Sequence, residues 1–347
     1  MITKKNFGKA PNGEEITLYS IANANGLQAD VMNFGAILVN LYVPNKKGKK
    51  ADVVLGYDDI KKYYKNGCYF GSTIGPLSNR TAKAKVKIDG KTYKLPVNDN
   101  ANNLHSDADA GLHKRVFKAK ADEKKNAVTF SVSLKDGELG LPGNRDFTVT
   151  YALTEDNGLE ITYTGKSDKE SLFNPTNHSY FNLRGHDAAT IEESTLQLNC
   201  SGYTEVEDDL IPTGKIVPVI GTPMDFTKPE VIGKRIRARY PQLRLAGGYD
   251  HNFVIDGANG KLKLAGVLSD KKAGRTMEVY TDMPGIQVYT ANFVGRHLGK
   301  EHVMYHRRNA VCLETQFFPN SANDKNFETP VLLPGKKVTY KTVYRFI

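Results

Sequence analysis

The chain of 347 residues is long enough to bury a large hydrophobic core, either as two domains or as one large β domain. Hydrophobic residues make up 39% of it and charged residues 25%, which is typical of a soluble globular protein and excludes a disordered one. The formal net charge is +10, but no run of about 18 apolar residues is present, so we expect no membrane-spanning segment.

The excess of lysine lies in short clusters at expected turns, such as residues 46–50 and 271–272. A nucleic-acid-binding protein concentrates its basic residues on one helix or stripe, whereas lysines at turns and strand edges mainly serve solubility. We therefore predict no nucleic-acid partner. Strong, salt-dependent binding to DNA would contradict this prediction.

The start of the chain and its cysteines indicate in which cellular compartment we expect the protein. The first seven residues have no apolar stretch behind their lysines, so they do not resemble a signal peptide. Cys68, Cys200 and Cys312 are widely spaced and cannot all pair, which suits a reducing environment. We expect a cytoplasmic protein, either a monomer or a homodimer.

Short runs of alternating apolar and polar residues recur along the chain between Gly, Pro, Asn and Asp. Asp89-Gly90 favours a two-residue hairpin. Helical periodicity is limited to residues 58–65, capped by Asp58, and a turn or two at 230–237. The runs predict strands at residues 14–22, 27–43, 86–88, 91–95, 127–134, 146–153, 159–164, 195–200, 252–256, 261–268, 275–281, 286–293, 310–317 and 336–346.

Many short strands separated by turns predict an all-β sandwich or barrel and argue against a doubly wound α/β fold. The chain has no internal repeat, low-complexity linker or break in composition. We therefore predict a single domain over residues 1–347.

The most unusual stretch is Asn-Pro-Thr-Asn-His-Ser-Tyr-Phe-Asn-Leu at residues 174–183. If the chain is extended after the proline, the side chains of Thr176, His178, Tyr180 and Asn182 share one face. That face is too polar for a core and too aromatic for an idle surface, so we interpret it as the wall of a wet pocket. The alternative is a hydrogen-bonded loop histidine without chemistry.

A second unusual residue is Glu314, which lies in the otherwise apolar run Ala-Val-Cys-Leu-Glu-Thr-Gln-Phe-Phe. Burying an unpaired carboxylate costs several kcal/mol, so this residue needs a partner, a proton or a function. The alternative is an edge strand that leaves Glu314 in solvent.

Both stretches resemble the aldose 1-epimerase (galactose mutarotase) family. Residues 176–183 match its Thr-Asn-His-x-Tyr-Phe-Asn-Leu signature, and residues 313–323 match its Leu-Glu-Thr-Gln-x-x-Pro-x-Ser-x-Asn stretch. The resemblance runs from about residue 6 to the C-terminus. It implies a large antiparallel β-sandwich with few short helices, and an isomerase that interconverts the α and β anomers of an aldose.

The resemblance also implies roles for individual residues. Glu314 is expected to be the catalytic base and His178 the acid that protonates the ring oxygen, the two exchanging roles on ring closure. No cofactor or metal is needed. The residues expected to bind the sugar are Asn79, Arg80, His105, Ser179, Tyr180, Asp250, Gln287 and Tyr289.

Two departures from the family pattern affect the expected pocket. Ser106 and Asp107 replace the two glycines after the family's Leu-His pair, and Gly75-Pro76 stands where Gly-Arg is usual. Ser and Asp resist backbone conformations that glycine permits, so we expect a pocket edge of different shape. The expected substrates are galactose and glucose, and a disaccharide such as maltose remains an alternative substrate.

Three other functions compete with this hypothesis. A metal hydrolase could use His302 and His306, but the chain has no His-Glu-x-x-His motif. A glycosidase could use Asp250 and Glu314 as facing carboxylates. A sugar-binding protein without catalysis is the third alternative, and the presence of both His178 and Glu314 argues against it.

Overall fold

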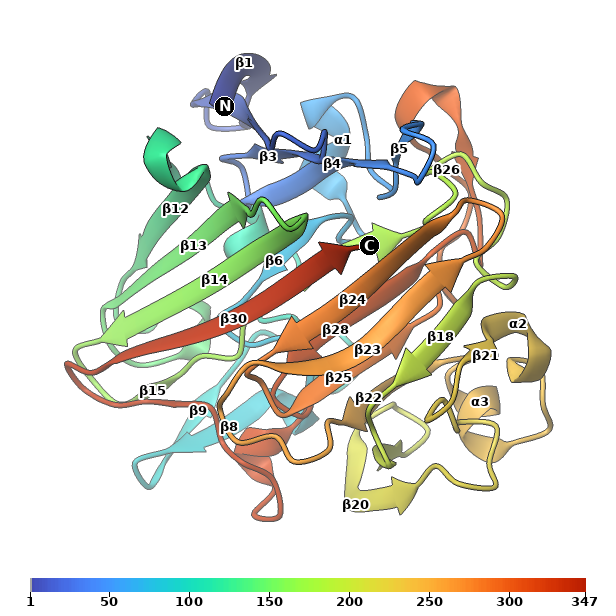
Figure 1. Ribbon diagram of the computed structural model, residues 1–347. Coiled ribbons are helices and arrows are strands. Elements are labelled where there is room, and N and C mark those ends of the chain that lie inside the picture. Colours follow the sequence, from blue (N-terminus) through green and yellow to red (C-terminus); the bar gives the residue numbers. More distant parts are fainter. Residues whose placement is uncertain (1) are drawn as a thin grey trace.

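A computed structural model describes residues 2–347, and antiparallel strands dominate it (Figure 1). The described residues form three short α-helices: α1 (Ile60–Lys65), α2 (Ile232–Arg235) and α3 (Pro241–Leu245). No helix in this part of the chain has the length and apolar character that crossing a membrane requires. Single 3₁₀ turns occur at η1 (Ala82–Ala84), η2 (Leu112–Lys114), η3 (Glu123–Lys125), η4 (Glu138–Gly140), η5 (Lys300–His302) and η6 (Ser321–Asn323).

The largest sheet has nine strands, and the C-terminal strand lies at its centre (Figure 1). Side chains alternate along it between the core and solvent, as the sequence pattern requires. In spatial order its strands are β11 (Lys118–Asp122), β12 (Ala127–Leu134), β13 (Arg145–Leu153), β14 (Gly158–Ser167), β30 (Lys337–Phe346), β24 (Arg275–Thr281), β23 (Lys263–Asp270), β18 (Thr195–Leu198) and β21 (Glu230–Val231).

Two further sheets complete the layers. The six-stranded sheet runs β17 (Tyr180–Phe181), β28 (Val311–Gln316), β25 (Gly285–Tyr289), β22 (Asp250–Val254), β19 (Gly202–Val206) and β20 (Pro212–Pro218). The five-stranded sheet runs β1 (Ile2–Lys9), β2 (Glu15–Ala22), β3 (Gln28–Met32), β4 (Ile37–Pro44) and β5 (Lys50–Asp52). Two-stranded ladders join β6 (Ser72–Ile74) to β16 (Thr176–His178), β7 (Arg80–Thr81) to β10 (Asn103–Leu104), β8 (Lys85–Ile88) to β9 (Lys91–Lys94), β15 (Ser171–Leu172) to β29 (Val331–Leu332), and β26 (His297–Leu298) to β27 (Met304–Tyr305).

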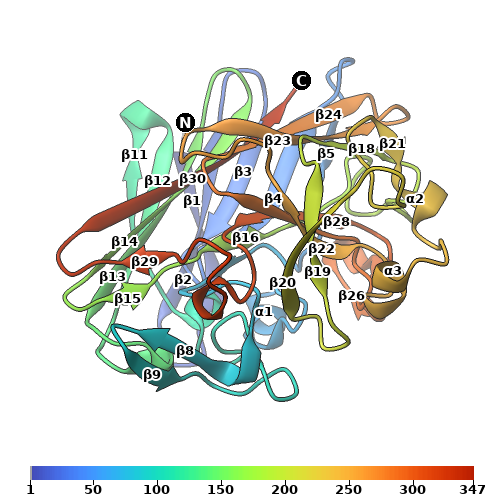
Figure 2. The same cartoon turned by 90° about the horizontal axis from the view of Figure 1, so that it is seen from below.

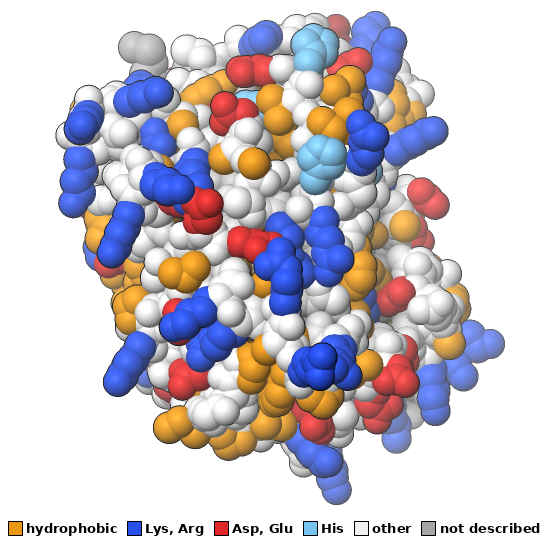
Figure 3. Space-filling model, turned by 90° about the vertical axis from the view of Figure 1, so that its right-hand side faces the viewer, with side chains coloured by type: hydrophobic (Ala, Val, Ile, Leu, Met, Phe, Trp, Pro, Cys, Tyr) orange, Lys and Arg blue, Asp and Glu red, His pale blue; other side chains and the backbone are white. Residues whose placement is uncertain are grey.

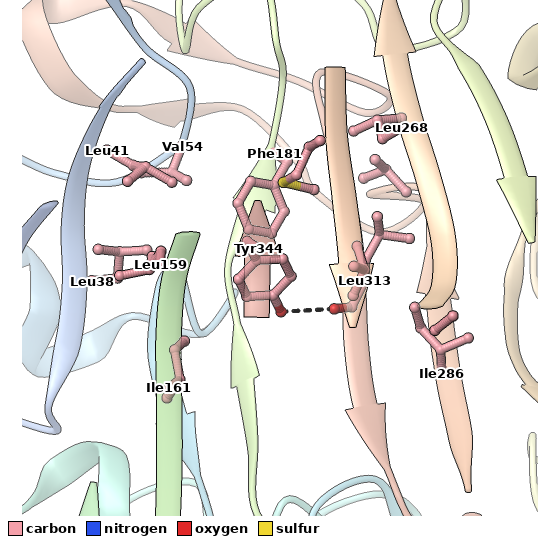
Figure 4. Close-up of a cluster of buried hydrophobic side chains, with 14 of the residues drawn as sticks. Leu38, Leu41, Val54, Leu159, Ile161, Phe181, Leu268, Ile286, Leu313 and Tyr344 are labelled. Carbon is pink, nitrogen blue, oxygen red and sulfur yellow. Dashed lines mark hydrogen bonds between the residues drawn. The ribbon is translucent and has the colours of Figure 1, made fainter. Parts of the chain in front are cut away.

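The main hydrophobic core lies between these sheets (Figure 4). Leu38 from β4, Ile161 from β14 and Ile286 from β25 all contribute to it. The Tyr344 hydroxyl on β30 donates a hydrogen bond to the Leu313 carbonyl on β28, at 2.9 Å, and so ties the nine-stranded sheet to the six-stranded one. One face of the six-stranded sheet therefore belongs to the core, which leaves its other face for a site.

The predicted β-sandwich is confirmed, as is the hairpin β8–β9, whose turn residues Asp89 and Gly90 both have positive φ. The strand expected at 27–43 is wrong in one respect. It is divided into β3 and β4, because Gly35 and Ala36 have φ of 64° and 44° and interrupt the extended backbone. The largest core cluster includes residues from both ends of the chain, and the single domain stays a prediction.

The predicted cap of α1 needs correction. The side chain of Asp59, not Asp58, accepts a hydrogen bond from the backbone N–H of Lys61 and caps the helix. Asp58 instead accepts a hydrogen bond from the backbone N–H of Glu301. The sequence placed two aspartates at this helix start, and only the backbone conformation distinguishes them.

Candidate active site

A pocket opens on the side of the six-stranded sheet that faces away from the core. Strands β16, β22 and β28, which contribute to it, lie near one another in Figure 2. Nine of the ten site residues predicted from the sequence line this pocket; the exception is Ser179. The lining residues are Gly67, Cys68, Tyr69, Asn79, Arg80, Leu104, His105, His178, Tyr180, Asp250, Gln287, Tyr289, Phe293 and Glu314.

Strand register brings the carboxylates and amides of the pocket together. Gln287 on β25 lies opposite Glu314 on β28, and Tyr289 lies opposite Asp250 on β22. Residues paired across antiparallel strands project from the same face of a sheet. The neighbour Leu313 points the other way, into the core. Alternation along three adjacent strands thus turns one sheet face into a polar wall.

His178 and Glu314 meet in this pocket. The Nε2 atom of His178 lies 3.7 Å from the Oε2 atom of Glu314, and only 5% and 2% of these residues are exposed. This distance is too long for a direct hydrogen bond, so a reacting group can still engage both. The imidazole stacks on the ring of Tyr180, with centroids 5.1 Å apart, and lies 5.8 Å from the ring of Tyr69.

Burial shifts the pKa values of this pair in opposite directions. Loss of solvation raises the pKa of Glu314 well above its usual range; the nearby Asp250 adds to the shift, and Arg80 partly offsets it. Loss of solvation lowers the pKa of His178 to about 4. Both shifts favour the neutral form of each group in the buried pocket.

Arg80 and His105 enter the pocket from the small ladder between β7 and β10. The Arg80 Nε atom donates a hydrogen bond to Asp99 at 2.9 Å, which fixes the guanidinium. The backbone N–H of Asn79 donates to His105 Nδ1 at 3.1 Å, so the proton of the neutral ring lies on Nε2. Burial lowers the pKa of His105 well below its usual range, and repulsion from Arg80, and from His178 when that ring is protonated, adds to the shift.

Asp250 and Gln287 form a hydrogen-bonded pair, in which Gln287 Nε2 donates to Asp250 Oδ1 at 2.7 Å. Burial raises the pKa of Asp250, whereas Arg80 and this hydrogen bond oppose the increase. Two acceptors in the pocket, Gln287 Oε1 and Glu314 Oε2, have no hydrogen-bond partner among the described residues. The wall therefore keeps acceptors available for a ligand rich in hydroxyl groups.

Ser179 does not belong to the pocket wall, which corrects its predicted place in the site. His178 and Tyr180 both line the pocket, and the side chain between them points to the opposite side. The Ser179 hydroxyl donates instead to the Asn177 side chain at 2.5 Å. Asn182, expected to share the pocket face, is likewise absent from the lining and donates to the Asn309 carbonyl.

Sequence reasoning missed several pocket residues, of which Tyr69 and Phe293 are the most prominent. The Tyr69 ring lies 4.9 Å from those of both His105 and His113. The Phe293 side chain is exposed and stacks near Tyr289, with centroids 6.3 Å apart. No motif marks either residue, because each reaches the pocket through the fold. Of the two, Phe293 was the easier to find from the sequence, because it lies at the end of the strand predicted at 286–293.

One group of possible metal ligands occurs among residues 2–347. Ligand atoms of His105, His178 and Glu314 all lie within 4.8 Å of one another. The histidine pair considered for a metal hydrolase, His302 and His306, is not part of this group. The absence of a metal requirement stays a prediction, which a chelator can test.

Comparison with known proteins is consistent with this geometry. The family model described as aldose 1-epimerase matches residues 17–345. A galactose mutarotase from Sus scrofa is 35% identical, over 99% of this chain and 98% of its own. The chain belongs to the aldose 1-epimerase family.

Solved structures agree with the assignment of this aldose 1-epimerase. An aldose epimerase homologue from C. elegans has a TM-score of 0.84 and 30% identity, and covers 95% of this chain and 98% of its own. A galactose 1-epimerase from Lactobacillus acidophilus NCFM has a TM-score of 0.87 and 26% identity, and covers 100% and 98%. This aldose 1-epimerase is therefore an isomerase of the mutarotase type, built on the mutarotase fold.

Proposed function

We propose that this enzyme interconverts the α and β anomers of galactose and glucose, without a cofactor, through Glu314 and His178. The observation that carries the proposal is the 3.7 Å separation of the two side chains in a pocket walled by polar groups. The names of similar proteins, galactose mutarotase and galactose 1-epimerase, favour galactose as a substrate.

The reaction moves one proton on and one proton off the sugar. The Glu314 carboxylate takes the proton of the anomeric hydroxyl as the bond between C1 and the ring oxygen breaks, and His178 gives a proton to that oxygen. The C1 carbonyl then turns, and the reverse transfers close the ring on its other face. Each transfer typically contributes about 10²–10⁴-fold to the rate.

The mechanism requires the pair to hold one proton in total. In the empty pocket the pKa directions place that proton on Glu314, because burial raises the carboxyl pKa and lowers that of His178. The raised pKa also makes the Glu314 carboxylate a stronger base whenever it is ionised. The positive charge of Arg80 favours the ionised Glu314 carboxylate, which together with a protonated imidazole is the form that reacts.

The remaining polar residues hold the sugar. Arg80, His105 and Asp250 bind its hydroxyl groups, so that both proton transfers are within reach. Gln287 orients the Asp250 carboxylate and has a free acceptor of its own. Asn79 contributes through its neighbours, because its backbone N–H fixes the His105 ring.

Polarimetry on freshly dissolved α-galactose, α-glucose and α-maltose tests the proposal. Glu314→Gln is expected to lower the rate of anomer interconversion by about 10²–10⁴-fold, because the amide cannot take the proton. Glu328→Gln makes the same chemical change at an exposed position and should leave the rate unchanged. Full activity in a chelator is expected, since no step uses a metal.

Three outcomes would contradict the proposal. A wild-type rate in Glu314→Gln would exclude this residue as the base. Binding of galactose without faster interconversion would indicate a sugar-binding protein, and a preference for maltose would move the substrate to a disaccharide.

We further propose a cytoplasmic location, on the ground that Cys68, Cys200 and Cys312 are all unpaired.

A further inference from the structure

A second hollow lies on the face of the molecule that carries α2 and α3. Figure 3 looks at this face and shows Lys and Arg side chains gathered near its middle beside acidic ones. The hollow is larger than the sugar pocket, about 560 Å³ against about 170 Å³. Its lining includes five arginines and one carboxylate, namely Arg237, Arg239, Arg244, Arg307, Arg308 and Glu192.

The single carboxylate leaves most of this positive charge unpaired. Both oxygens of Glu192 accept hydrogen bonds from Arg237, each at 2.7 Å. The Nε atom of Arg308 lies 3.8 Å from the same carboxylate. The three remaining arginines of the hollow form no ion pair with any carboxylate of residues 2–347. The hollow therefore presents an excess of guanidinium groups to whatever enters it.

Arg308 is the buried anchor of this cluster, with 8% of its surface exposed. It donates hydrogen bonds only to neutral acceptors: the Gly247 carbonyl at 2.6 Å, the carbonyl and hydroxyl of Thr290, and the side-chain oxygen of Asn292. Arg307 donates to the same Gly247 carbonyl at 2.5 Å. One oxygen thus holds two guanidinium groups side by side, an arrangement that an anion would stabilise.

The backbone beneath Arg308 is shaped to accept the guanidinium. Gly248 has φ of +142°, and a Cβ atom there would lie 2.5 and 2.6 Å from the two terminal nitrogens of Arg308. Only glycine allows this approach. The arginine is therefore built into the fold through a specific glycine, unlike the exposed lysines at residues 46–50.

We propose that this hollow binds the phosphate group of a small phosphorylated compound. Guanidinium groups match phosphate oxygens through paired hydrogen bonds, and a phosphate carries more negative charge than one carboxylate. The apolar side chains of Ile236 and Leu243 also line the hollow and suit the organic part of such a compound. A concave site favours a compact anion, whereas nucleic acid is bound by an extended basic stripe.

Isothermal titration calorimetry with inorganic phosphate and pyrophosphate, at constant ionic strength, tests this proposal. We expect saturable binding of one anion per chain, with pyrophosphate tighter than phosphate. The double variant Arg244→Gln/Arg307→Gln should weaken binding about tenfold or more, because each charge-assisted hydrogen bond contributes at least that order. Mutarotase activity of the variant should be unchanged, which also shows that it folds.

A matched control separates a site from general attraction to a basic protein. Lys46→Gln/Lys47→Gln removes the same charge from an exposed turn and should leave pyrophosphate binding intact. Equal weakening by both double variants, or no saturable binding to the wild type, would overturn the proposal. So would duplex DNA that binds through Arg244 and Arg307 and is not displaced by pyrophosphate.

Discussion

Ser106 occupies a backbone conformation that side chains rarely adopt, with φ of +68°, directly after the pocket residue His105. The sequence raised the question of how a serine replaces a family glycine here. Its hydroxyl provides the answer, because it accepts a hydrogen bond from the Leu77 N–H at 2.8 Å and donates one to the Leu77 carbonyl at 2.9 Å. Ser106→Ala keeps the strained φ and loses both bonds, so it should destabilise the protein by about 1–3 kcal/mol.

Ser106→Gly is the informative companion at this position. It loses the same two hydrogen bonds but removes the strain of a positive φ, which costs about 1 kcal/mol for a residue with a Cβ atom. The free energy of unfolding, measured in urea, should therefore fall less for the glycine variant than for the alanine variant. If the two variants fall equally, backbone strain at Ser106 is not part of its energetics.

Whole elements were predicted where a local pattern decides them. Alternation located most strands of the nine-stranded sheet, and Asp89-Gly90 located the hairpin β8–β9. Strand β1 was missed, because its sequence has mostly polar residues and is held by pairing with β2. Helix α3 was missed as well. Such elements form because they pair with or pack against residues that are distant in the sequence. A local sequence pattern does not reveal these contacts.

The residues of the site show the same difference between what a local pattern predicts and what the fold decides. His178 and Glu314 stand in motifs that single them out, and the packing of β16 beside β28 then places them in one pocket. Ser179 was included because it lies inside a motif, although alternation turns it away. Tyr69 was missed because no motif surrounds it, and its positive φ of 57° leaves no mark in the sequence.

The β8–β9 turn provides a test of turn chemistry at the scale of an element. Gly90 has φ of +73°, whereas Gly295 does not have a positive φ, and a Cβ atom would meet nothing within 4 Å at either position. Gly90→Ala should therefore destabilise the protein by about 1 kcal/mol through backbone strain alone. Gly295→Ala should be neutral or stabilise it by about 0.4–1 kcal/mol, because it restricts the unfolded chain. Urea denaturation of both variants measures the difference, and equal values would contradict the assigned turn.

At the scale of the whole molecule, burial has an electrostatic consequence that spreads over several elements. Five of the eight histidines have a lowered pKa, and in each case loss of solvation is the main cause. The unfolded chain protonates these residues near pH 6.5, before the folded protein does. They are His105, His113, His178, His186 and His251. As the pH falls from about 6.5 to the pKa that a histidine has in the folded protein, each of these residues removes about 1.4 kcal/mol of stability per pH unit.

Two buried carboxyl groups and one partly buried one oppose this effect. The pKa values of Glu314, Asp250 and Asp282 are raised by burial, so the folded protein binds their protons first and gains stability as the pH falls. Burial lowers the pKa values of His113, His178 and His251 to about 3, 4 and 3, so a plot of stability against pH should slope downward as the pH falls from about 6.5 to 4.5. Urea denaturation between pH 4.5 and 7 measures this slope. His113→Gln should reduce this slope by about 1.4 kcal/mol per pH unit, because the pKa of His113 is lowered to about 3 and a glutamine does not titrate. The slope is the decisive quantity, because a glutamine at position 113 can change the stability by the same amount at every pH. A slope that His113→Gln leaves unchanged would show that buried histidines do not govern acid unfolding.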